Sequence, residues 1–338
     1  MRKAFGLSLL AFAVALVSCG PVADPRAAQI DLLPPQVVAV QSLGPDRIGV
    51  QFDEDAGLCE GTTRIDPPLA ISGVTGPGKE IEIHGAAQTP GLPYTLEAEA
   101  QDARGNTASF MAIFYGYNAD VPDLLINEIT PRGSGAHPDL VELKAMSGGD
   151  MGGVALYLGT PGSYDTRFVF PSFSVGRGGF IVVHLKPSGD PSEVDEPGNP
   201  VLSRGADASD AAYDFWIADC KGLGGNNGVL SLYTRPGGKC LDGVLYSNRT
   251  SQSDQAYRGF GSADMLARAE ELVQEGGWKT AGARVLPEDA VSPESSTGTR
   301  SLCRTSGSLD TDSASDWHVV PTRGATPGGE NSDEVYTP

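Results

Sequence analysis

Apolar and polar positions alternate in a period of two between residues 36 and 118. The clearest apolar faces are Ile48, Val50, Phe52; Ile81, Ile83; and Tyr94, Leu96, Ala98, Ala100. Because successive side chains of a strand point to opposite sides, this alternation predicts half-buried antiparallel strands. Turn signals rich in Gly and Pro at 44–46 and 76–78 separate the strands at intervals suited to a small β-sandwich. We therefore predict a first domain over residues 36–118.

The end of this segment resembles the last hairpin of bacterial immunoglobulin-like domains. The family forms that hairpin turn with D-x-x-G-N, and Asp102, Gly105 and Asn106 match it. The resemblance implies an immunoglobulin-like fold for the first domain and indicates no particular function.

From residue 121 onward, short apolar runs again alternate with turns. The pieces are, in order, N-E-I, P-D-L-V-E-L-K, G-V-A-L-Y-L-G, F-V-F-P, G-G-F-I-V-V, S-L-C-R, D-T-D-S-A-S-D-W and T-P-G-G-E-N. Their order and spacing resemble the lamin tail domain. The resemblance implies a second immunoglobulin-like sandwich over residues 121–332 and an interaction module without catalytic residues. The expected fold class is therefore all-β, with two antiparallel β-sandwich domains.

Two segments exceed what this second domain needs. Residues 186–214 are rich in Asp and Glu and are predicted to form an exposed acidic loop whose deletion leaves the melting transition nearly unchanged. Residues 262–276 predict a helix, because Ser262 can cap its start, apolar residues recur on one face and Gly276 can end it. We expect specificity to reside in these insertions, with the helix packed over the sandwich.

The N-terminus has the pattern of a secretory signal. A basic start at Arg2 and Lys3 precedes an apolar stretch over 4–17, which is too short for a spanning helix. The run L-V-S-C ending at Cys19 resembles the bacterial lipobox. That resemblance implies a signal peptide over 1–18, acyl chains such as palmitate on Cys19 and a flexible linker over 19–35. It places the chain in the cell envelope, and the Gly after Cys19 favours the outer membrane or cell surface.

The net negative charge of the chain argues against one class of partner. The 338 residues include 43 acidic and 24 basic side chains, which give a formal net charge of −19. Such a surface repels the phosphate backbone of nucleic acids. We therefore expect no nucleic acid partner. The expected partners are a membrane, reached through the N-terminal lipid, and an unidentified extracellular or envelope protein or glycan.

Four cysteines remain besides Cys19. An exported chain meets an oxidising environment, and no C-x-x-C pair occurs, so scattered cysteines predict disulfides rather than zinc. Cys220 and Cys240 bracket a hairpin-like segment and are the first predicted pair. Cys59 and Cys303 then form a second pair by elimination, joining the two domains.

Candidate chemistry in the sequence is sparse. The four histidines are dispersed, and His84 and His184 fall in strand-like runs. No G-x-S-x-G elbow, Walker loop or catalytic-cysteine signature occurs in the sequence, so no catalytic residues or enzyme activity are predicted. Asp310, Asp312 and Asp316 crowd three carboxylates into one loop, which is a candidate calcium site; the alternative is that they bond to loop amides. No other cofactor is indicated.

Three functions remain open on these grounds. The first is a non-enzymatic envelope lipoprotein that binds or scaffolds a partner outside the membrane. The second is an accessory module for a secreted nuclease or phosphatase, since bacterial lamin tail domains often accompany such enzymes. The third is a purely structural envelope component.

Overall fold

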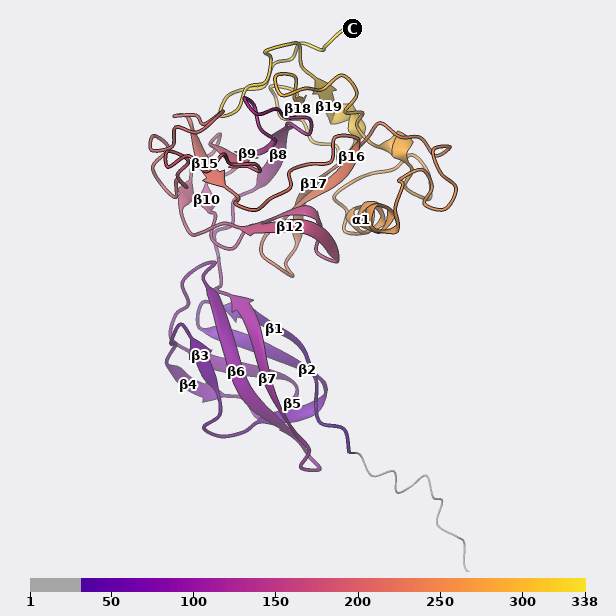
Figure 1. Cartoon of the computed structure of the whole chain (residues 1–338). Coiled ribbons are helices and arrows are strands. Elements are labelled where there is room, and N and C mark those ends of the chain that lie inside the picture. The colour runs from indigo at the N-terminus through magenta and orange to yellow at the C-terminus, as the bar shows by residue number, and fades with distance from the viewer. Residues whose placement is uncertain (1–31) are drawn as a thin grey trace, which may run out of the picture.

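The computed structural model describes residues 32–338, and strands dominate it (Figure 1). One α-helix, α1 (Ala263–Gln274), and two short 3₁₀ helices, η2 (Pro287–Asp289) and η3 (Ala314–Asp316), accompany the strands in this part of the chain. The predicted all-β class is therefore confirmed. The predicted signal peptide, Cys19 and most of the linker lie outside the described residues. No helix within 32–338 is long and apolar enough to cross a membrane.

The first domain is built from seven strands. They are β1 (Val37–Gly44), β2 (Arg47–Leu58), β3 (Arg64–Asp66), β4 (Ile71–Val74), β5 (Gly78–Gly85), β6 (Pro93–Asp102) and β7 (Thr107–Tyr115). β2 is long: its first half pairs with β1 and β5, and its end pairs with β6. The alternating apolar residues predicted from the sequence, among them Val50, Ile81 and Leu96, form one buried core. The turn at 102–106 forms as expected, because the Asp102 carboxylate accepts the backbone N–H groups of Arg104 and Asn106.

The second domain contains a four-stranded and a six-stranded sheet. The first has the order β12 (Ser163–Val169), β11 (Ala155–Thr160), β16 (Asn227–Tyr233), β17 (Cys240–Ser247). The second has the order β15 (Ala212–Trp216), β14 (Phe180–His184), β9 (Leu140–Ala145), β8 (Leu124–Ile129), β18 (Leu302–Arg304), β19 (Trp317–Val319). A two-stranded ribbon joins β10 (Gly149–Asp150) to β13 (Ser174–Val175). Both larger sheets contribute to one buried core, which includes Leu143 and Ile181 from one and Leu156 and Leu230 from the other.

The predicted helix is confirmed. Ser262 caps it by accepting the backbone N–H of Met265, and Met265, Ala269 and Leu272 are buried. The helix packs against β11, β12 and β16 (Figure 1). On its outer side, the Glu271 carboxylate accepts the backbone N–H of Gly162. The 262–276 segment therefore belongs to the second domain's core, as expected.

The acidic segment 186–214 is mostly exposed, as its composition predicts, but two of its carboxylates, Glu196 and Asp214, are buried. Its Glu196 is buried and accepts the backbone N–H groups of Leu202, Ser203 and Asp214. The end of the segment enters β15, which pairs in parallel with β14. Glu196 and Asp214 bond to backbone donors inside the segment instead of facing water. These buried groups lead us to expect that removal of the segment lowers stability, as argued below.

The predicted disulfides are also corrected. The four cysteines in the described part of the chain are free. Cys220 lies beside Thr166 of β12, whereas Cys240 lies in β17, at the opposite edge of the same sheet. Three strand spacings of ~4.8 Å separate those edges, roughly twice the Cα separation of ~7 Å that a disulfide can bridge. Cys59 and Cys303, the other predicted pair, are likewise free: Cys59 follows β2 in the first domain, and Cys303 is buried in β18 of the second.

The two domains touch through a few polar contacts. The Asn118 side-chain amide donates to the carbonyl groups of Asp150 and Gly152. The Arg235 guanidinium donates to the Gln41 side chain at 3.0 Å. These contacts place the β16–β17 hairpin against β1 of the first domain.

Candidate functional site

Two buried carboxylates connect motifs that lie far apart in the sequence. Glu128 on β8 and Glu142 on β9 are cross-strand neighbours with no solvent exposure. The Glu128 carboxylate accepts the backbone N–H of Thr326, and Glu142 accepts that of Gly328. The N-E-I, V-E-L and T-P-G-G-E-N pieces therefore form one internal network, in which the carboxylates hold the C-terminal segment on the sheet.

The predicted calcium ligands instead surround a buried arginine. The Arg304 guanidinium, which has no solvent exposure, lies 3.0 Å from the Asp310 carboxylate and 3.3 Å from that of Asp316. Asp312 pairs with Lys279 at 2.8 Å. The described residues include no group of three or more His, Cys, Asp or Glu side chains placed to bind a metal ion. The structure shows the alternative, bonding to loop amides: Asp310 accepts the backbone N–H of Asp312, and Asp316 accepts those of Thr311 and Ser313.

Asp242 completes this cluster from the other sheet. Both of its oxygens accept from Arg304, at 3.1 and 3.2 Å, and one also accepts the backbone N–H of Ile126. Burial raises the pKa of the Asp242 carboxyl to about 7, although the charge of Arg304 acts in the opposite direction. Burial likewise raises the pKa of Glu128 and, with the charge of Glu128 beside it, that of Glu142.

These raised pKa values predict an unusual pH profile of stability. An acid whose pKa is higher in the folded than in the unfolded chain stabilises the fold below its unfolded pKa, and loses that contribution as pH rises through the folded pKa. The melting temperature of the second domain should therefore fall between about pH 4.5 and pH 8. Glu142→Gln removes one such acid, so the melting temperature of this variant should depend less on pH than that of the wild type. Thermal unfolding of both proteins at constant ionic strength measures the difference. A wild-type melting temperature that rises over this range would contradict the raised pKa values.

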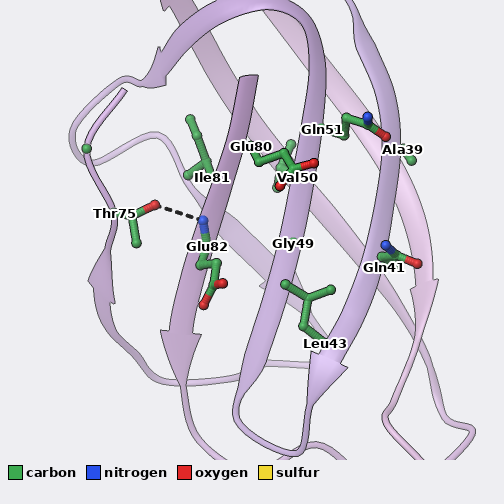
Figure 2. Close-up of a pocket in the computed structure, with 11 residues that line it drawn as sticks. Ala39, Gln41, Leu43, Gly49, Val50, Gln51, Thr75, Glu80, Ile81 and Glu82 are labelled. Atoms are coloured by element: carbon green, nitrogen blue, oxygen red, sulfur yellow. Dashed lines mark hydrogen bonds between the residues drawn. The ribbon is translucent and has the colours of Figure 1, made fainter. Parts of the chain in front are cut away.

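A groove lies on the outer face of the first domain's sheet (Figure 2). Its volume is about 360 Å³, and it is lined by residues of β1, β2, β5 and the turn before β5. Gly49 creates its floor, because a Cβ there would lie 2.9 Å from Leu43. Its polar groups are partly occupied: Glu82 pairs with Arg47 at 3.5 Å, and Gln41 accepts from Arg235.

A second cavity, of about 280 Å³, lies at one end of the six-stranded sheet. Segments from four parts of the chain line it: the β8–β9 connection, the acidic insertion, the loop before β18 and the C-terminal segment. Its lining residues are Thr130, His137, Leu140, Asp207, Gly298, Thr299, Arg323, Ala325 and Pro327. We call it the loop-end pocket. The apolar part of this lining is formed by Leu140, Ala325 and Pro327.

Polar groups of the loop-end pocket are fixed in place. The Nδ1 atom of His137 lies 2.8 Å from the Asp207 carboxylate. Gly298 approaches His137 so closely that a Cβ at that glycine would lie 2.9 Å from the His137 Cβ. Asp207 and Arg323 both adopt positive φ angles, +61° and +66°, although neither is glycine. Such backbone conformations cost roughly 1–3 kcal/mol each and cluster at functional sites.

The sequence did not reveal this pocket. His137 and Asp207 are 70 positions apart, and no spacing rule joins them to Arg323. Asp207 was noticed only as one charge of the acidic insertion, and the histidines only as dispersed. His184 lies in a strand, as expected, and is buried with its Nε2 atom 2.6 Å from the Asp214 carboxylate. The predicted cysteines Cys59 and Cys303 lie in different domains, away from this pocket.

The second domain matches a known family over most of its length, although the pocket residues Arg323, Ala325 and Pro327 lie beyond the matched range. A family model described as "TP_1001_2nd: protein second domain" matches residues 122–319, a range that begins just before β8 and ends with β19. A protein of Treponema pallidum (strain Nichols), named "Uncharacterized protein", is 26% identical over 191 residues. That match covers 56% of this chain and 48% of the relative, so the chain spans about half of that protein's length. The chain therefore belongs to the TP_1001 second-domain family.

Proposed function

We propose that this chain is a non-enzymatic binding module of the cell envelope, held at a membrane by lipid on Cys19. In this proposal the first domain is an immunoglobulin-like spacer, and the second is a sandwich of the lamin tail type that carries the ligand site. The partner is an extracellular or envelope protein or glycan, met at the outer membrane or cell surface.

The loop-end pocket carries the proposal. Ligand sites are concave, largely apolar and lined by a few polar groups, and this cavity combines the apolar residues Leu140, Ala325 and Pro327 with polar ones. The polar residues include His137, Asp207 and Arg323. It also contains Asp207 from the acidic insertion, the segment that exceeds the expected fold. In this proposal the insertion contributes to ligand binding because Asp207 forms part of the pocket lining.

The buried carboxylates and the buried histidine elsewhere in the second domain favour a binding role over catalysis, because they already have partners inside the protein. Glu128 and Glu142 hold the C-terminal segment, Asp242 faces Arg304, and His184 is stacked on Trp216 with ring centroids 3.8 Å apart. Each is buried and engaged with internal partners. A general acid or base must instead reach a substrate within hydrogen-bond distance.

Changing Cys19 to Ala is expected to move the protein from the membrane fraction to the soluble fraction. Two or more acyl chains give stable anchoring. The variant lacks the Cys19 sulfur to which lipid would be attached, so it should not receive these chains. Fractionation followed by intact-mass measurement tests this. Cys59→Ala is the matched control and should stay with the membrane. A wild-type chain whose mature N-terminus is unmodified would overturn the anchoring part of the proposal.

A further inference from the structure

Several polar groups of the loop-end pocket are open. In residues 32–338, the Arg323 guanidinium makes no ion pair, and the hydroxyl groups of Thr130 and Thr299 make no hydrogen bond to another residue. The Nδ1 atom of His137 is committed to Asp207, which leaves Nε2 for a ligand. Thr130 is buried and Thr299 is half-buried, and polar groups in such positions normally find partners. Arg323 is exposed, and its guanidinium is also available to something that enters the cavity.

The chemistry of these groups selects the ligand. A guanidinium matches a carboxylate, with which it can form two parallel hydrogen bonds. With Nδ1 directed at Asp207, the Nε2 atom of His137 is left to form a hydrogen bond with a ligand hydroxyl, which can donate or accept. The threonine hydroxyls likewise donate or accept as needed. The apolar lining residues Leu140, Ala325 and Pro327 suit the C–H face of a ring.

The size of the cavity agrees with this choice. About 280 Å³ is slightly below the ~300 Å³ at which pockets for drug-sized ligands begin, so one sugar-sized group fits. Arg323 is an exposed lining residue without an ion pair among the described residues, so its guanidinium is free to bind an anion in a chain with a net charge of −19. The surrounding negative charge would repel a polyanion and leave room for a single carboxylate.

The geometry points to the loop-end pocket as a binding site for one hydroxylated carboxylate, of the kind found in a terminal uronic acid of a glycan. This inference rests on the proposed function, and it adds the ligand's chemical class. Arg323 takes the carboxylate, His137 and Thr299 take hydroxyl groups, and Asp207 sets the orientation of the imidazole.

The test measures binding of glucuronic acid and of glucose to the purified full chain, by ligand-observed NMR and calorimetry. Glucuronic acid should bind at least about tenfold more tightly than glucose, since a charged hydrogen-bond pair discriminates by roughly that factor. Arg323→Gln should remove this preference, and Thr299→Val should weaken glucuronic acid binding several-fold. Arg284→Gln, an exposed arginine outside the pocket, should change nothing.

Folding of each variant is checked by its melting temperature. Should Arg323→Gln fail to fold, Thr299→Val, which changes no charge, decides the outcome. Equal affinity for the two sugars, no binding of either, or full binding by a folded Arg323→Gln variant would overturn the ligand assignment. If Cys19→Ala still releases the protein from the membrane in that case, the ligand class has failed while the anchoring in the proposed function stands.

Discussion

Replacing Arg304 with Met is expected to lower the free energy of unfolding of the second domain by about 3–5 kcal/mol at pH 8. The guanidinium is fully buried and faces Asp242, Asp310 and Asp316. Methionine leaves these carboxylates without their cation, and an uncompensated buried charge is the main cost of breaking such a cluster. Many domains are stable by only ~5–15 kcal/mol, so the variant should be close to unfolding.

The same variant should be less damaged near pH 5. The pKa of Asp242 is about 7 because of burial, and losing Arg304 raises it further, so the carboxyl can be neutral at that pH. Urea unfolding at both pH values measures the difference. Arg204→Met, which breaks the exposed pair with Asp210, is the control and should cost ~1 kcal/mol or less. An Arg304→Met variant as stable as this control would contradict the described cluster.

Deleting residues 186–214 is expected to abolish cooperative folding of the second domain while the first domain keeps its own transition. The deletion removes most of β15 and both buried carboxylates of the segment, Glu196 and Asp214. It leaves His184 buried without its acid partner and uncovers the apolar cluster of Leu140 and Val182. Each of these changes is a recognised cause of large destabilisation.

A single substitution at Glu196 measures the contribution of its carboxylate to stability separately from the other effects of the deletion. Glu196→Ala leaves three backbone N–H groups without their acceptor and should cost about 3 kcal/mol or more, at ~1.5–3 kcal/mol per charged hydrogen bond less partial rescue by water. Glu193→Ala, which affects only a local turn at Ser188 and Gly189, should cost about 1 kcal/mol. Calorimetry of both variants decides. A deletion variant that retains two unfolding transitions would show the segment to be dispensable, as its composition first indicated.

The elements that depend on local pattern could be predicted from the sequence. Alternation gave the strands of the first domain, and Ser262 with the apolar stripe gave α1, because both depend on residues a few positions apart. The D-x-x-G-N turn formed for the same reason, through bonds from Asp102 to residues two and four positions later.

Pairings across the fold could not be predicted in this way. The carboxylates of 310–316 indicated a metal because nothing local shows that Arg304 is buried among them with Asp242, which is 62 positions away. The acidic insertion looked exposed because composition does not show that Glu196 turns inward toward backbone donors. Cys220 and Cys240 are close in sequence, but β11 and β16 lie between β12, which Cys220 neighbours, and β17, which contains Cys240.

The most direct test of a binding role for the loop-end pocket is recovery of ligand from envelope extract by three immobilised chains. These are the wild type, Arg323→Gln and the Arg284→Gln control, with bound material eluted and analysed by mass spectrometry. We predict that the wild type and the control retain the same carboxylate-bearing component, chemically unchanged, and that Arg323→Gln does not. Retention that is identical for all three chains, or a component recovered as a cleaved product, would contradict the account.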